Sequence, residues 1–181
     1  KEGIRTLRLN VQHDDPRLYE YEHVPLPPYI AQDDSLAGEY QTVYAKPLGS
    51  LAAPTAGLHF TPGLLADIAK SHEITEVTLH VGLGTFTKLT EDNLKTGRLH
   101  EEYFEVASEV AKKLNEAVHR TAVGTTTVRT LESAFDSGFM PKAGATDIFI
   151  QHGYHFQTVD GMITNFHLPS TSLLMLVAAF L

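Results

Sequence analysis

The chain has 181 residues, of which 43% are hydrophobic and 20% are charged, which is enough to bury one sizeable core. The absence of cysteine excludes disulfides, thiolate nucleophiles and radical chemistry that depends on a cysteine-held iron–sulfur cluster. A formal net charge of −8 argues against a broadly basic surface, so any RNA would have to bind at a local patch.

Residues 1–23 open with an alternation of apolar and polar side chains that ends in a polar break. A period of two is typical of strands, so this segment predicts the last strand or two of a small β-unit. No targeting segment precedes it, and we expect the chain to start inside a domain. Pro25, Pro27 and Pro28 fix φ and remove hydrogen-bond donors. We therefore place a domain boundary here and expect a second domain over residues 24–181.

Strands and helices alternate through the rest of the chain. The pattern predicts strands at residues 42–45, 75–81, 102–106, 122–124, 146–150 and 162–166. It predicts helices at residues 61–72, 106–119 and 125–137 and a last one that opens after Pro169. Such alternation is typical of a layered α/β domain with a mostly buried sheet. The closing apolar run, residues 173–181, is about half the length of a membrane-spanning helix, so we expect no membrane partner.

Residues 52–60, AAPTAGLHF, place small side chains around Thr55, Gly57 and His59. A ligand could approach this backbone closely, and the threonine and histidine could form hydrogen bonds with it. Taken alone, a loop histidine is more often a surface or structural residue.

Residues 78–86, TLHVGLGTF, end a predicted strand in a glycine-rich turn that contains Gly82, Gly84 and Thr85. Ligands in open α/β sheets bind at the carboxyl ends of strands, which favours a site here. The segment lacks the third glycine of a dinucleotide-binding fingerprint. His80 could equally be an inward-facing strand histidine that bonds to the backbone.

Residues 123–132, VGTTTVRTLE, form a strand, a turn and a helix start. Free N–H groups at such a start can hold a carboxylate or a phosphate. Thr125, Arg129 and Glu132 fall on one face of the predicted helix, beside Thr126 in its first turn. The alternative is a solvated Arg–Glu pair.

Residues 160–172, DGMITNFHLPSTS, join a strand to the final helix and bring Asn165 and His167 to the strand's exit. Polar groups that converge on an apolar scaffold suit a small-molecule pocket. Ten histidines raise the question of zinc, but no pair has the spacing of a metal motif. We expect no metal.

Several long phrases, in this order, resemble the S-adenosylmethionine:tRNA ribosyltransferase-isomerases of queuosine biosynthesis. They are HVPLPPYI, YQTVYA, GSLAAPTAGLHFT, VTLHVGLGTF, LHEEYFEV, VGTTTVRTLE, TDIFI and DGMITNFHLPSTSLLMLVAAF. The resemblance implies an α/β catalytic domain in which residues 1–23 are the remnant of a small inserted β-barrel. It also implies that family segments at both ends are missing. The sequence departs from the family pattern at Lys88, Gly97 and His152.

This family transfers and isomerises the ribosyl moiety of S-adenosylmethionine onto 7-aminomethyl-7-deazaguanine at the wobble position of tRNA. The product is epoxyqueuosine, and adenine and methionine are released. The resemblance thus implies an enzyme of the cytoplasm, with tRNA as partner and S-adenosylmethionine as co-substrate. It implies no prosthetic group. The oligomeric state is open, with a monomer favoured.

The implied chemistry needs general acids and bases with a pKa near neutral, for which histidine is the natural candidate. Our hypothesis gives these roles to His59, His80, His100 and His167, with Glu102 tuning a partner. Residues 125–127 and Arg129 would bind the methionine carboxylate or a phosphate.

Two alternatives come from other classes of protein. The chain could be a non-catalytic or truncated protein that binds RNA and S-adenosylmethionine, which the departures and the acidic charge suggest. It could also be a metal-dependent hydrolase built from its histidines, which ranks last.

Overall fold

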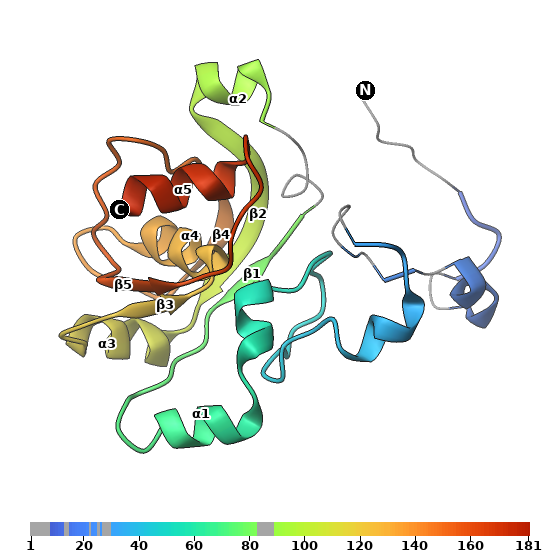
Figure 1. The fold of residues 1–181 in the computed structure, drawn as a ribbon, viewed down its shortest axis with the longest axis horizontal. Coiled ribbons are helices and arrows are strands. Elements are labelled where there is room, and N and C mark those ends of the chain that lie inside the picture. Colours follow the sequence, from blue (N-terminus) through green and yellow to red (C-terminus); the bar gives the residue numbers. More distant parts are fainter. Residues whose placement is uncertain (1–7, 13–14, 22, 25, 27–29, 83–88) are drawn as a thin grey trace.

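The computed structural model describes residues 8–12, 15–21, 23–24, 26, 30–82 and 89–181. The helices of the α/β body are α1 (Pro62–Ile68), α2 (Glu91–Thr96), α3 (Ser108–Glu116), α4 (Thr125–Ala134) and α5 (Ser172–Phe180). Its strands are β1 (Thr78–His80), β2 (Arg98–Val106), β3 (Thr121–Val123), β4 (Lys142–Ile148) and β5 (Gly161–Ile163). Three 3-10 helices precede them, η1 (Pro16–Tyr21), η2 (Asp34–Gly38) and η3 (Thr55–His59). The N-terminal part extends away from this body (Figure 1).

The strands form two small sheets. The order of the larger sheet is β1-β2-β4 with both pairs antiparallel, and β3 pairs with β5 in parallel. The expectation of a mixed α/β domain is confirmed. The expectation of a mostly buried sheet is wrong, because β2 buries Glu102, Phe104 and Val106 but exposes Tyr103 and Glu105 on its other face. A two-residue alternation of this kind is typical of an antiparallel sheet with one solvated face.

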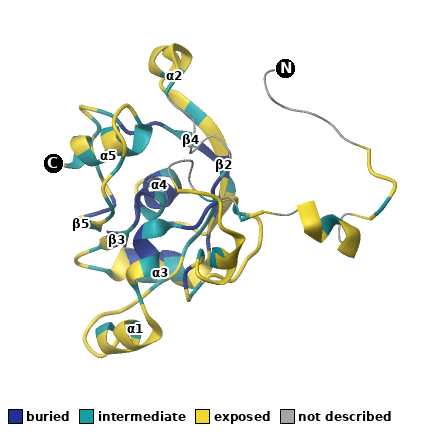
Figure 2. Cartoon of the chain, turned by 45° about the vertical axis from the view of Figure 1, so that its right-hand side comes forward, coloured by how far each residue is buried: buried dark blue, intermediate teal, exposed yellow. Residues whose placement is uncertain are grey.

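Helix α4 occupies the centre of the core (Figure 2). It packs against β1, β2, β3, β4 and α5, and Val128 and Thr130 on it are completely buried. The core cluster consists of Phe104, Val106, Ala111, Leu114, Ala122, Val128, Leu131, Ala134, Phe139, Ile150, Val159 and Leu176. Because α4 packs against four of the five strands and against α5, its position determines where the side chains at its N-terminal end lie.

The helix ends follow from local chemistry. The Thr61 hydroxyl caps α1 by accepting from the Leu64 N–H, and Pro62 occupies the first turn. Thr171 caps α5 in the same way. Helix α2 was not predicted, although Thr90 and Asn93 form a reciprocal capping box at its start. Gly97 ends α2 with a φ of 66°, a conformation that favours glycine.

The strands predicted in the N-terminal part of the chain are not found in its described residues. In the described part of residues 8–23 the structure has the 3-10 helix η1 and no strand, so the barrel remnant is not confirmed. The boundary at residue 24 stays a prediction. The strand predicted at residues 42–45 is wrong: this segment is a turn in which the Ala45 N–H donates to the Thr42 carbonyl over 3.2 Å.

Candidate functional site

A buried ion pair joins the larger sheet to the central helix. Arg129 Nη1 donates to Glu102 Oε2, and the side chains are 7% and 3% exposed. Glu102 Oε1 also accepts from the Gly82 N–H at 3.1 Å. Arg129 Nε and Nη2 are buried and have no hydrogen-bond partner among the residues that the structure describes. An unsatisfied buried guanidinium is costly, so these two donors point to an anionic or carbonyl group that a ligand would supply.

The N-terminus of α4 lies against the PTAGLHF loop. Gly124, with a φ of 88°, stands just before the helix, and its N–H donates to the Ile163 carbonyl at 2.8 Å. A Cβ on Gly124 would lie 3.9 Å from the Ala56 Cβ, so η3 is in contact with this turn. Thr125 is 5% exposed. The helix end that was expected to hold an anion therefore has the small-residue loop as its neighbour.

A hydrogen bond across 106 residues of sequence connects two of the predicted segments. His59 Nε2 lies 3.1 Å from Asn165 Oδ1, which brings the end of η3 to the segment after β5. Gly57, two residues earlier, is required by close packing, because a Cβ there would lie 2.1 Å from the Tyr44 Oη. Thr55 opens the same 3-10 helix and is half-buried.

His80 ends β1 and lies between two other segments. Its ring stacks on Tyr103 with centroids 5.7 Å apart. On the other side, a Cβ on Gly49 would lie 3.0 Å from His80 Nδ1. The next residue, Val81, donates to the Ser50 hydroxyl at 2.8 Å and accepts from the Leu51 N–H at 2.9 Å. Residues 49–51 and β2 thus both contact the end of β1 that carries His80.

The other predicted site residues are spread out. His100 is exposed on β2, where the register with β4 shifts between Arg98 and Glu102. His167 is half-buried, and burial lowers its pKa below the usual value. Thr126 is half-buried in the first turn of α4. Gly84 and Thr85, like Lys88, lie outside the described residues.

The Glu132 carboxylate accepts its hydrogen bonds from other residues of the chain. Its carboxylate accepts from the Tyr154 hydroxyl at 2.9 Å, from the Gln157 N–H at 3.2 Å and from both the N–H and the hydroxyl of Thr158. The solvated Arg–Glu pair does not occur, because Arg129 and Glu132 are both buried and Arg129 pairs with Glu102. In this structure, Glu132 holds residues 154–158 against α4.

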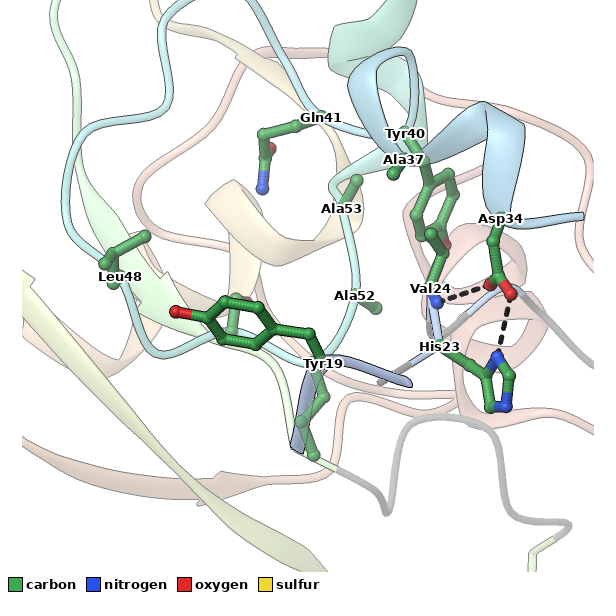
Figure 3. A pocket seen from close by; sticks show the side chains of 12 residues that line it. Tyr19, His23, Val24, Asp34, Ala37, Tyr40, Gln41, Leu48, Ala52 and Ala53 are labelled. Carbon is green, nitrogen blue, oxygen red and sulfur yellow. Dashed lines mark hydrogen bonds and ion pairs between the residues drawn. The ribbon is translucent and has the colours of Figure 1, made fainter. Parts of the chain in front are cut away.

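A cavity of about 760 Å³ opens on the other side of residues 48–53. It is lined by Tyr19, His23, Val24, Asp34, Ala37, Tyr40, Gln41, Leu48, Ser50, Leu51, Ala52 and Ala53 (Figure 3). None of the predicted catalytic residues is among them. At its rim His23 Nδ1 lies 2.7 Å from Asp34 Oδ2. The sequence analysis missed this cavity, although HVPLPPYI and YQTVYA, which carry His23 and Gln41, were available as signals.

The described residues include no group of three or more His, Cys, Asp or Glu side chains placed to hold a metal ion, and no helix among them could span a membrane. Three features of the predicted site segments suit the binding of a small molecule. They are the Arg129 guanidinium, with two donors that lack a partner among the described residues, the N-terminus of α4 and a histidine bonded to an amide.

The whole chain, residues 1–181, matches the model of the family described as queuosine biosynthesis protein, and the chain belongs to this family. It is 50% identical, over 99% of its length, to the S-adenosylmethionine:tRNA ribosyltransferase-isomerase of Natranaerobius thermophilus. It is also 50% identical, over 98% of its length, to the enzyme of that name from Macrococcus caseolyticus. The chain spans about half the length of these relatives, 54% and 55%.

A solved structure shares the fold. The crystal structure of S-adenosylmethionine tRNA ribosyltransferase from Thermotoga maritima matches with a TM-score of 0.52 and 42% identity. The match covers 69% of this chain and 40% of that one.

Proposed function

We propose that this chain forms the larger part of a catalytic domain that transfers and isomerises the ribosyl moiety of S-adenosylmethionine. The acceptor is 7-aminomethyl-7-deazaguanine in tRNA, the product is epoxyqueuosine, and adenine and methionine leave. The enzyme acts in the cytoplasm, and we favour a monomer. S-adenosylmethionine is a co-substrate, so no prosthetic group is required.

One observation supports the proposal: segments that resemble the family, although far apart in sequence, contact one another in the folded chain. Gly82 bonds to Glu102, Glu102 to Arg129, and His59 to Asn165. Gly124 connects the loop at Ala56 with the end of β5. A chain that had kept the family's fold but lost its site would not need to keep these contacts between the segments.

Arg129 binds the methionine carboxylate of S-adenosylmethionine in this proposal. Its Nε and Nη2 are the buried donors that lack a partner among the described residues, and a guanidinium presents such donors in a fork that matches a carboxylate. The N–H groups in the first turn of α4, at Thr125 and Thr126, add a partial positive charge. Glu102 keeps Arg129 in place through the buried ion pair and so acts as a positioning residue.

The histidines supply the proton transfers. His59 ends η3 and His80 ends β1, and burial lowers the pKa of His167, so it stays neutral at lower pH than a free histidine. A neutral imidazole can accept a proton beside the sulfonium and return one to departing adenine. His59 and His100 are both exposed, and His100 on β2 is the weaker of the two because His59 is at least bonded to Asn165.

The test uses the intact protein with S-adenosylmethionine and substrate tRNA, and it measures free adenine and epoxyqueuosine. We expect His80→Gln to lower turnover by about 10²- to 10⁴-fold, while His72→Gln, an exposed control after α1, stays at the wild-type rate. Arg129→Lys should mainly raise KM for S-adenosylmethionine. Binding of both substrates without adenine release would instead support a non-catalytic protein.

A further inference from the structure

Tyr103 and His80 form an aromatic pair on the solvated face of the larger sheet. They stand opposite each other in the antiparallel register of β1 and β2 (Figure 1), and side chains at such positions point to the same face. The ring centroids are 5.7 Å apart and the planes differ by 19°, within the range of offset-stacked pairs. Tyr103 is 45% exposed and is not part of the core cluster, so its ring packs on His80 rather than in the core.

Gly49 limits the position of the same imidazole from a second segment. Its φ is 137°, in the region that favours glycine. A Cβ at this position would lie 3.0 Å from His80 Nδ1 and 3.1 Å from His80 Cε1, so the backbone itself approaches the ring closely. The bonds of Ser50 and Leu51 with Val81 hold this segment to the end of β1. Packing therefore restrains the imidazole from two parts of the chain.

This packing leaves the ring nitrogens of His80 available. Neither nitrogen makes a hydrogen bond to a residue that the structure describes. His59 differs, because its Nε2 lies 3.1 Å from Asn165 Oδ1. A general acid or base needs a free nitrogen on a ring that stays in place. Stacking on Tyr103 meets both needs, since it restrains the ring without using either nitrogen.

Strand β2 contacts two residues of the candidate site from adjacent positions. Glu102 points to the core, where it pairs with Arg129, and Tyr103 points to the opposite face, where it stacks on His80. Successive side chains of a strand alternate in this way. A displacement of β2 would therefore disturb both Arg129 and His80, whereas a replacement of the Tyr103 ring would disturb His80 alone.

We infer that Tyr103 is a positioning residue of the proposed reaction and that it acts through His80. Its ring, and not its hydroxyl group, holds the imidazole in the orientation from which a nitrogen exchanges a proton with the substrate. The inference rests on the proposed function for the role of His80. A small displacement of a reacting group can cost about 100-fold in rate, so loss of the Tyr103 ring should slow the reaction without removing a group that contacts the substrate.

The first measurement is made by NMR on the intact protein without substrate. In the wild type, the ring protons of His80 should show NOE cross-peaks to those of Tyr103, and carbon relaxation should show an ordered imidazole. Tyr103→Phe keeps an aromatic ring and should keep this order. Tyr103→Leu should lower the order parameter of the imidazole. Tyr21→Leu, at an exposed tyrosine of η1, is the control and should leave it unchanged.

The second measurement is the rate of adenine release with S-adenosylmethionine and substrate tRNA. Tyr103→Leu should lower kcat about 10- to 100-fold and leave KM for S-adenosylmethionine within about twofold, while Tyr103→Phe should retain the wild-type rate. In the His80→Gln background, Tyr103→Leu should change kcat by no more than about twofold, because the imidazole that it positions is absent. A merely structural role would lower kcat by the same factor in both backgrounds.

The outcomes separate this inference from the proposed function. If the imidazole stays ordered in Tyr103→Leu, or if kcat falls by the same factor in both backgrounds, Tyr103 does not act through His80. If Tyr103→Phe is as slow as Tyr103→Leu, the hydroxyl group is needed, which also contradicts the inference. An imidazole whose order depends on Tyr103, in a protein that releases no adenine, would confirm that Tyr103 holds His80 and would count against the proposed reaction alone.

Discussion

Replacing Glu102 by alanine tests the buried ion pair at the centre of the candidate site. The two side chains are 3% and 7% exposed, so solvent cannot compensate for the lost carboxylate. Arg129 would then be buried with all three guanidinium nitrogens unpaired, since Nε and Nη2 already lack partners among the described residues. The Gly82 N–H would lose its acceptor as well. Leaving one partner of a buried pair uncompensated costs about 3–5 kcal/mol of unfolding free energy.

Urea unfolding followed by circular dichroism measures this loss, and thermal unfolding should show Tm lowered by about 6–20 °C. Glu105→Ala, an exposed position on the same strand, is the control and should change stability by no more than about 0.5 kcal/mol. The double variant Glu102→Leu with Arg129→Met should recover most of the loss, because it leaves no buried charge. A loss below about 1 kcal/mol for Glu102→Ala would refute the reasoning.

Three further predictions concern local features. Gly57→Ala should cost about 1–3 kcal/mol of unfolding free energy in a urea titration, because its Cβ would lie 2.1 Å from the Tyr44 Oη. The control Gly63→Ala, where the nearest atom to the new Cβ is 3.9 Å away, should leave the unfolding free energy unchanged. Thr61→Ala should destabilise by about 1 kcal/mol through loss of the α1 cap, and an unchanged urea midpoint would contradict this. Burial lowers the pKa of His167, so the folded state binds fewer protons than the unfolded state just below the usual pKa of 6.5. Stability should therefore fall as pH drops through that value, and His167→Gln should flatten this dependence in urea titrations at several pH values.

The sequence predicted the elements that have strong local signals. Thr61 with Pro62 and Thr171 mark helix starts through cap chemistry, which acts within one turn. The Val-Gly-Thr-Thr junction before α4 was expected as a strand, a turn and a helix start, and it is one. Helix α2 was missed because its six residues have no apolar periodicity, even though Thr90 and Gly97 carried cap signals.

Other features depend on distant contacts that no spacing rule contains. Arg129 and Glu132 share a helix and were paired with each other as one possibility, but they bond to partners 27 and 26 residues away. The pocket beside residues 48–53 combines η1, η2 and a loop, and its lining does not form a motif. The short apolar alternation at residues 42–45 is a turn because Thr42 and Ala45 bond to each other.

The hydrogen bond between His59 and Asn165 can form only late in synthesis of the chain. The ribosome makes His59 first and must add 106 further residues before its partner exists. At about 5–20 residues per second, the histidine waits on the order of 5–20 s. Until then η3, which carries His59, lacks its hydrogen-bond partner in the segment after β5. The contact at His59 therefore forms later than contacts between residues that lie close together in sequence.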